Sequence, residues 1–153
     1  MRRLAAVVTF AATFTIGPNF PAQADLSWEV RRSEVRFQTW LWPRDAFTTR
    51  EVVAVISNAA RRLGVDPAKA LAVADCESGL YPKAVSASGT YRGLFQHSIN
   101  YWAGRVAWYR STWGAAHPKL QIKAAAPVLH PRPNALVSML MVRIGGYGPW
   151  SCA

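Results

Sequence analysis

The chain has 153 residues, enough for one domain, and carries 18 Lys and Arg against 8 Asp and Glu, a formal net charge of +10. No Lys- and Arg-rich run with interleaved aromatic residues occurs, so nucleic acid is not an expected partner. The 3 histidines lack the spacing of a metal site and no acidic residue follows Glu77, so neither a metal nor a cofactor is expected.

Residues 1–24 have the three parts of a secretory signal. Arg2-Arg3 is followed by an apolar run from Leu4 to Ile16 and by the small-residue site Ala22-Gln23-Ala24. The run is too short to span a bilayer, and a core helix at the N-terminus is the alternative. Cleavage after Ala24 would leave 129 of the 153 residues, with no other long apolar stretch. The sequence therefore predicts a secreted, soluble monomer with no integral membrane span in the mature chain.

The charge of the mature chain suggests its partners. Without the two arginines of the signal, 16 basic and 8 acidic residues remain, a formal charge of +8. Such a surface attracts polyanions, and for an exported protein these are anionic cell-wall polymers, acidic muropeptides and membrane headgroups. The alternative is that the charge only keeps the protein soluble.

The segment 25–47 fits neither a helical nor a strand period, and its structure is left unassigned. The first clear helix follows, with Thr48-Thr49 as its N-cap and Gly64 as its end. Its apolar side chains recur at helical spacing. They are Val52, Val55, Ile56, Ala59 and Leu63.

A second helix is predicted to start at Asp66-Pro67, a capping residue followed by proline at the first helical position. It continues toward Glu77, which therefore lies at the C-terminal end of a helix. Residues 78–96 are rich in Gly, Pro and Ser and predict a short hairpin or an extended loop.

Two further helices are predicted, from Ser98 to about Tyr109 and from Pro133 through Ile144, with 111–132 as a loop between them. Leu136, Leu140 and Ile144 form the apolar stripe of the last helix. Trp102, Trp108 and Trp150 are expected in the core. The fold class is α+β, mostly α-helical, with a small β element after Glu77.

Glu77 is the last acidic residue, which points to a site with one acid. Asp75 faces another side of the same helix, Asp66 is a cap, and Glu51 lies in the first turn of the earlier helix. Four carboxylates of segment 25–47 stay open as partners, namely Asp25, Glu29, Glu34 and Asp45. Most glycoside hydrolases use two carboxylates, but one suffices when the substrate supplies its own nucleophile, as N-acetylated sugars do.

The two cysteines predict one disulfide, because an exported chain meets an oxidising environment. Cys76 and Cys152 are its partners, and closing so long a loop stabilises the fold by roughly 4–5 kcal/mol in the chain-entropy model. A nucleophilic Cys76 is the competing hypothesis.

The motif after Cys76 is specific. Glu77-Ser78-Gly79-Leu80-Tyr81-Pro82 is followed by Ala84, Ser86 and Gly89, and then by Gly93-Leu94-Phe95-Gln96. This order resembles the lytic transglycosylases and goose-type lysozymes, and Asn134 resembles the residue that leads a helix in that family. The resemblance covers roughly residues 48–153, the predicted domain, and implies a lysozyme-like fold. The Phe95-Gln96-His97 stretch and Trp150-x-Cys152 resemble short secreted actinobacterial variants.

The resemblance implies an enzyme that cleaves the β-1,4 bond between N-acetylmuramic acid and N-acetylglucosamine in peptidoglycan glycan strands. Glu77 would act as general acid and then as base, releasing an anhydro-muramyl product. Ser86 would bond near the acetamido group, Gln96 would orient the muramyl sugar, and Gly93 would let the backbone approach the substrate closely. Ser78 belongs to the Glu-Ser motif.

The chain departs from the family at one point. The Tyr-Asn-Ala-Gly segment, whose tyrosine helps to hold the acid, is absent, and Tyr147 in Gly145-Gly146-Tyr147-Gly148 is the candidate to stand near Glu77. Tyr91 either stacks on a sugar or caps the hairpin, and Ser86 is alternatively a turn serine. Two other functions stay open: lysozyme-type hydrolysis of the same bond, and a non-catalytic peptidoglycan-binding module.

Overall fold

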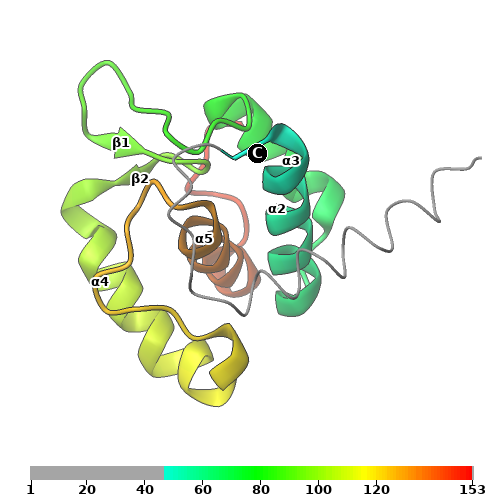
Figure 1. Cartoon of the computed structure of the whole chain (residues 1–153), viewed down its shortest axis with the longest axis vertical. Helices are drawn as coiled ribbons and strands as arrows, with labels where there is room; N and C mark the ends of the chain where they lie inside the picture. The colour runs from blue at the N-terminus through cyan, green and yellow to red at the C-terminus, as the bar shows by residue number, and fades with distance from the viewer. Residues whose placement is uncertain (1–46, 153) are drawn as a thin grey trace, which may run out of the picture.

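The computed structural model describes residues 47–152 (Figure 1). The predicted signal, nearly all of segment 25–47 and the four carboxylates of that segment lie outside the described residues. In chain order the elements are α2 (Thr49–Leu63), α3 (Pro67–Ser78), β1 (Tyr91–Arg92), β2 (His97–Ser98), α4 (Ile99–Tyr109), η1 (Arg110–Gly114), η2 (Pro118–Leu120) and α5 (Pro131–Gly145). Between residues 47 and 152, no helix is both long and apolar enough to cross a membrane.

Helix α2 begins and ends where its capping residues predict. Thr48 and Glu51 form a capping box: the Glu51 amide donates to Thr48 Oγ1 at 3.2 Å, and the Thr48 amide donates to Glu51 Oε2 at 3.1 Å. Gly64 closes the helix in the left-handed conformation, at a φ of 69°. The predicted apolar face is buried, and α2 packs through it against α3 and α5.

Helix α3 also follows its sequence signals. Asp66 Oδ1 accepts the Ala68 amide at 2.9 Å, and Pro67 occupies the first turn, where a missing N–H costs nothing. Gly79 and Leu80 then both adopt the left-handed conformation, at φ of 59° and 56°. This double turn ends the helix directly after Glu77 and Ser78 and directs the chain into the hairpin.

The small β element predicted after Glu77 is present. β1 and β2 are antiparallel, with Tyr91 opposite Ser98 and Arg92 opposite His97, and an isolated bridge joins Val85 to Arg92. The long loop that precedes β1 projects beyond the helices (Figure 1). The domain is thus mostly helical with one small sheet, as the sequence predicts.

The predicted loop 111–132 is partly wrong, because helical structure continues beyond α4. η1 is a π-helical turn, and the hydroxyls of Ser111 and Thr112 donate to the Trp108 carbonyl at 3.1 and 2.7 Å. Such side-chain bonds compete for the carbonyl of the preceding turn and favour irregular helix geometry. Pro118 then starts the 3₁₀ turn η2, where its missing N–H is again harmless.

Helix α5 starts two residues before the predicted Pro133. His130 Nδ1 accepts the Arg132 amide at 3.3 Å and so caps the helix, while Pro131 fits the first turn. The expectation that Ile144 continues the apolar stripe is wrong: this side chain is 67% exposed, because the last turn of α5 extends past the packed core.

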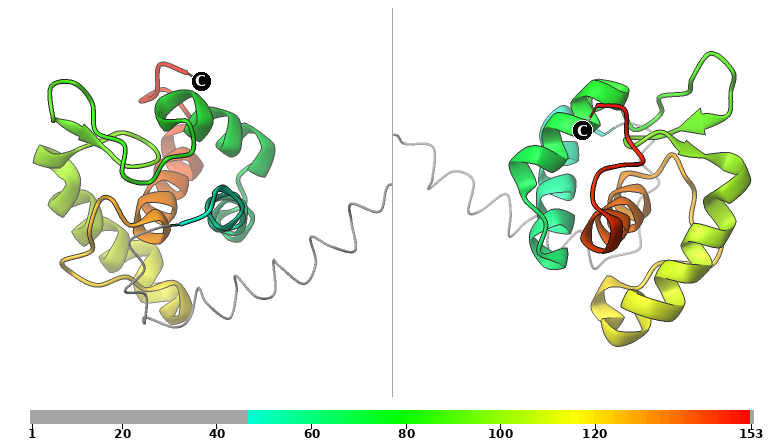
Figure 2. Two further views of the ribbon diagram at one scale, coloured as in Figure 1. Left: turned by 45° about the horizontal axis from the view of Figure 1, so that its top comes forward. Right: turned by 180° about the vertical axis from the view of Figure 1, so that it is seen from behind.

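Helix α5 is the centre of the domain. Figures 1 and 2 show α2 and α3 on one side of it and α4 on the other. Its side chains from Ala135 to Leu140 are buried and contact apolar residues of the surrounding helices. Trp102 and Trp150 belong to this core as predicted, whereas Trp108 is only partly buried and packs against its edge.

Candidate active site

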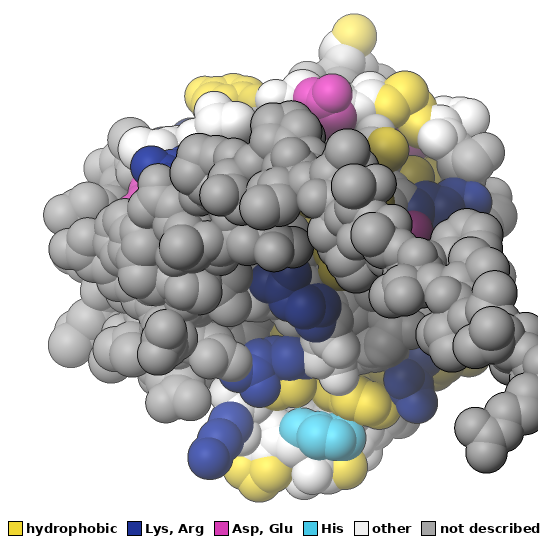
Figure 3. All heavy atoms as spheres, turned by 90° about the vertical axis from the view of Figure 1, so that its right-hand side faces the viewer, with side chains coloured by type: hydrophobic (Ala, Val, Ile, Leu, Met, Phe, Trp, Pro, Cys, Tyr) yellow, Lys and Arg dark blue, Asp and Glu magenta, His cyan; other side chains and the backbone are white. Residues whose placement is uncertain are grey.

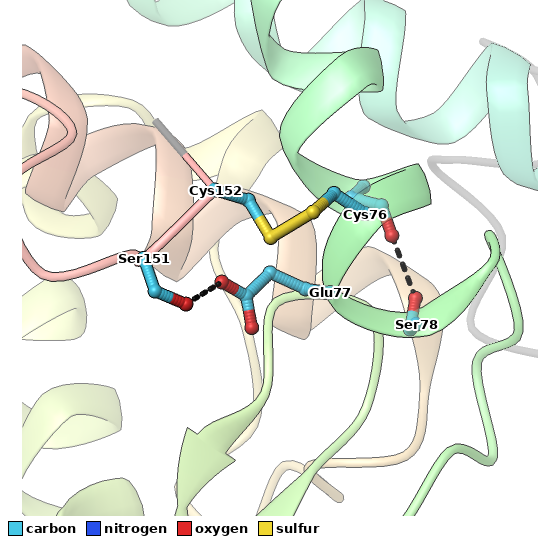
Figure 4. The surroundings of a disulfide bond; sticks show 6 residues. Cys76, Glu77, Ser78, Ser151 and Cys152 are labelled. Carbon is cyan, nitrogen blue, oxygen red and sulfur yellow. Dashed lines mark hydrogen bonds between the residues drawn. A yellow bond between two sulfur atoms is a disulfide. The ribbon is translucent and has the colours of Figure 1, made fainter.

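Glu77 lies in the last turn of α3, with its side chain half-buried. Figure 4 shows the carboxylate pointing toward the C-terminal segment, where Ser151 Oγ donates to Glu77 Oε1 at 3.5 Å. The end of α3 and the C-terminal segment therefore meet at this carboxylate.

A disulfide joins the residues next to this pair. Cys76 precedes Glu77, Cys152 follows Ser151, and the two cysteines are bonded with their Cα atoms 6.0 Å apart. Neither cysteine is a free thiol. The crosslink therefore holds the C-terminal segment against the end of α3, as Figure 4 shows.

The other carboxylates of residues 47–152 have different positions. Glu51 caps α2 and Asp66 caps α3, each at a helix N-terminus. Asp75 is exposed and lies two residues before Glu77, so the two side chains leave α3 in different directions. Within the described residues, Glu77 is thus the carboxylate at the junction of α3 and the C-terminal segment.

The loop serines named by the motif make local hydrogen bonds. Ser78 Oγ donates to the Ala74 carbonyl at 2.9 Å, which reinforces the last turn of α3. Ser86 Oγ accepts the Tyr91 amide at 3.0 Å and lies 3.1 Å from Ser88 Oγ, so it shapes the long loop that precedes β1. The Tyr91 side chain is 50% exposed.

Gln96 adopts a backbone conformation that side chains rarely favour, with a φ of 44°. Its side chain folds back over the turn: Nε2 donates to the Gly93 carbonyl at 2.9 Å and reaches the Ala84 carbonyl at 3.5 Å. Strained backbone of this kind persists where surrounding structure holds it, and it is concentrated at functional sites.

Close packing inside the protein requires a glycine at position 93. It has a φ of 81°, and a Cβ there would lie 2.6 Å from the Val128 carbonyl and would collide with the Asn134 amide. The close neighbour on this side is therefore Asn134. Its buried side chain accepts the Phe95 amide at 3.1 Å and donates to Val128 O at 2.8 Å. Asn134 thus ties the start of α5 to the turn that precedes Gln96.

The arrangement agrees with a known enzyme family. The model of the family described as the Transglycosylase SLT domain matches residues 54–143, more than half of the chain. The chain belongs to this family. Its members are peptidoglycan lytic transglycosylases, so the protein is a peptidoglycan-cleaving enzyme with the lysozyme-like fold that the motif predicts. No curated protein and no solved structure matches the chain significantly.

The C-terminal part of this transglycosylase lies outside the matched residues. Tyr147, the candidate to stand near the acid, has its ring 4.8 Å from Lys69 Nζ and 6.2 Å from the Trp150 ring. Lys69 precedes Glu77 by two helical turns, about 12 Å along α3. Burial, followed by the Asp66 carboxylate, raises the pKa of Tyr147. Its hydroxyl is buried and has no hydrogen-bond partner among residues 47–152.

The chain contains a buried polar cluster that the sequence did not reveal. Arg105 Nη1 donates to His97 Nδ1 at 2.7 Å, which places the imidazole proton on Nε2, 2.8 Å from Ser138 Oγ. Ser138 in turn donates to the Asn134 carbonyl at 2.8 Å. Burial, and then the Arg105 charge, lower the pKa of His97 to about 3, so the ring is neutral at ordinary pH.

A ligand or a metal ion bound elsewhere on the transglycosylase domain would need a place that can hold it. A shallow depression of about 460 Å³ lies on α4, lined by Tyr101, Gly104, Arg105 and Trp108, and none of the motif residues lines it. In the part of the chain that the structure describes, no group of three or more His, Cys, Asp or Glu side chains is placed to hold a metal ion.

Proposed function

We propose that this transglycosylase uses Glu77 to cleave the β-1,4 bond between N-acetylmuramic acid and N-acetylglucosamine. The proposal is supported by the position of Glu77, the one carboxylate of the described residues where the end of α3 and the C-terminal segment meet. Membership of the family supports the substrate class.

The chemistry requires one acid. Glu77 would give its proton to the glycosidic oxygen as the bond to the anomeric carbon breaks, and the acetamido oxygen of the substrate would stabilise that carbon. Glu77 would then take the proton of the muramyl primary hydroxyl as that oxygen closes onto the anomeric carbon. The carboxyl returns to its starting state, no water is consumed, and the product is an anhydro-muramyl sugar.

The residues of the hairpin supply candidate substrate contacts. Tyr91 is exposed on β1, where its ring is available to stack on a sugar. Gln96 directs its amide nitrogen into the protein, so its side-chain oxygen is the atom that we assign to the muramyl sugar. Ser86 offers its hydroxyl from the long loop that precedes β1, next to the Tyr91 amide.

The basic surface fits an acidic polymer outside the cell. Figure 3 shows several Lys and Arg side chains exposed on the face of the domain that it views. We propose that such residues draw the enzyme to anionic cell-wall polymers after export by the N-terminal signal, and that it acts there as a monomer. Binding to purified cell walls that weakens as salt is raised would support this role.

The test of the proposal is muropeptide release from purified peptidoglycan by Glu77→Gln, with Asp75→Asn as the matched control. We expect Glu77→Gln to lose several orders of magnitude in rate and Asp75→Asn to keep it. Mass spectrometry of the products identifies the reaction, because an anhydro product is lighter by one water than a hydrolysis product. Full activity of Glu77→Gln would remove Glu77 from the mechanism, and a product with the added water would identify a hydrolase.

A further inference from the structure

Ser151 is the one residue among those described whose side chain hydrogen-bonds the Glu77 carboxylate. The two residues are separated by 74 positions in the sequence and belong to different elements. The 3.5 Å between Ser151 Oγ and Glu77 Oε1 is long for such a bond. Hydrogen bonds of catalytic groups are often long without substrate and shorten in the complex.

Both neighbours of Ser151 are fixed. Trp150 is buried, its indole N–H donates to the Phe95 carbonyl at 2.8 Å, and its ring lies 5.9 Å from that of Phe95. On the other side, Cys152 is bonded to Cys76, the residue before Glu77. The backbone of Ser151 is therefore held at two adjacent points, one in the core and one on α3.

The same contacts connect the part of the site at Gln96 with the part at Glu77. Phe95, which accepts the Trp150 N–H, is also held by Asn134 and directly precedes Gln96. The C-terminal segment thus contacts the turn before Gln96 and the helix end at Glu77 together. Figure 2 shows this segment, in red, running beside α3.

We propose that Ser151 is a positioning residue for Glu77, and that the Cys76–Cys152 disulfide fixes the position of Ser151. A glutamate side chain has several rotatable bonds, and fixing it costs entropy that a hydrogen bond offsets. A bond to Oε1 leaves Oε2 to carry the proton to the glycosidic oxygen. This role rests on the proposed function of Glu77, and it lies in a part of the chain outside the matched family domain.

The first test compares Ser151→Ala with Ser151→Thr in steady-state muropeptide release. We expect the alanine variant to lower kcat about 10-fold with KM unchanged, because a hydrogen bond to a carboxylate is lost from the reacting state. Threonine keeps the hydroxyl and should restore most of the rate. Ser111→Ala is the matched control: this exposed serine belongs to η1, bonds to Trp108, and should leave kcat unchanged.

A second readout does not depend on activity. Three-bond NMR couplings of the Glu77 side chain report its χ1 rotamers, and Ser151→Ala should change a single dominant rotamer into an average of several. If the wild-type protein releases no muropeptides, the proposed function fails while these couplings still test the contact. Wild-type kcat together with wild-type couplings in Ser151→Ala would overturn the positioning role.

The disulfide is tested by a double-mutant cycle. Replacing both Cys76 and Cys152 with serine should lower kcat by about the same 10-fold, and adding Ser151→Ala should cause no further loss. Losses that multiply would show that the disulfide does not act through Ser151. An amide NMR spectrum of the variant verifies that it is folded, and if it is not, the Ser151 variants alone decide the proposal.

Discussion

The side-chain amide of Asn134 packs against the Cα of Gly93, in the space that any other residue at position 93 would fill with its Cβ. The contact joins the first turn of α5 to the turn before Gln96. The conformation of the motif Gly-Leu-Phe-Gln is thus set by a residue 39 positions beyond Phe95.

Gly93→Ala should destabilise the protein by roughly 2–4 kcal/mol, from left-handed strain and the collision with Asn134. The matched control is Gly104→Ala in α4, where an added Cβ meets nothing within 4 Å. That substitution should stabilise the helix by about 0.5–1 kcal/mol. Urea denaturation of the two variants measures the difference, and equal effects would contradict the contact described here.

Asn134→Ala should cost about 2–4 kcal/mol, because the Phe95 amide and the Val128 carbonyl would both lose their partner inside the protein. Asn100→Ala removes an exposed asparagine from the first turn of α4 and should change stability by less than about 0.5 kcal/mol. Denaturant midpoints distinguish the two. An Asn134→Ala variant as stable as Asn100→Ala would show that the two hydrogen bonds of the Asn134 side chain contribute nothing to stability.

Acid should destabilise the fold through His97. The folded pKa of His97 is lowered from 6.5 to about 3, by burial first and by Arg105 second, so between these values the unfolded chain binds a proton that the folded protein excludes. The free energy of unfolding should therefore fall as pH drops below 6.5, by at most about 1.4 kcal/mol per pH unit from this group.

The measurement is urea denaturation from pH 7 to pH 4. His97→Gln should be less stable at pH 7 but should lose less of its stability on acidification. The exposed His117 gives the control, and His117→Gln should keep the wild-type slope. His130, whose pKa burial also lowers, is present in every variant and contributes equally to all of them. Identical slopes in wild type and His97→Gln would refute the assignment.

Reduction of the disulfide should lower the free energy of unfolding by about 2–5 kcal/mol, because it joins residues 76 positions apart and restricts the unfolded chain. Oxidised and reduced wild-type protein should therefore have different denaturant midpoints. The variant with serine at both cysteine positions should resemble the reduced protein and should not respond to reductant. A midpoint that reductant leaves unchanged would exclude a stabilising crosslink.

Local signals were enough to predict most elements of the fold. Thr48 and Gly64 bound α2, and Asp66-Pro67 and Gly79 bound α3, because caps depend on neighbouring residues only. The loop after α4 was less predictable, since η1 depends on hydroxyls bonding back to Trp108. Ile144 was placed wrongly because periodicity shows which side of a helix is apolar but not where the core ends.

The site was predictable in its motif but not in its contacts. The adjacency of Cys76 to Glu77 and of Ser151 to Cys152 was a usable signal, since a disulfide between the cysteines brings the other two residues close together. No comparable signal marked the bond from His97 to Ser138, 41 positions away. Tyr147 was chosen by its place in the sequence, and its ring contacts Lys69 and Trp150.

The sequence by itself determined the four main helices, the short hairpin, the disulfide partners and the place of Glu77 at a helix end, because each depends on local chemistry or on a count of residues. Only the tertiary structure decided that Ser151 meets Glu77, that Asn134 requires glycine at position 93, and that His97 is buried against Arg105. The cysteines indicated only that Ser151 lies near Glu77. The contacts themselves depend on how the elements pack around α5, which no local pattern encodes. The motif therefore singles out Glu77 as the candidate acid, and the fold decides which residues surround it.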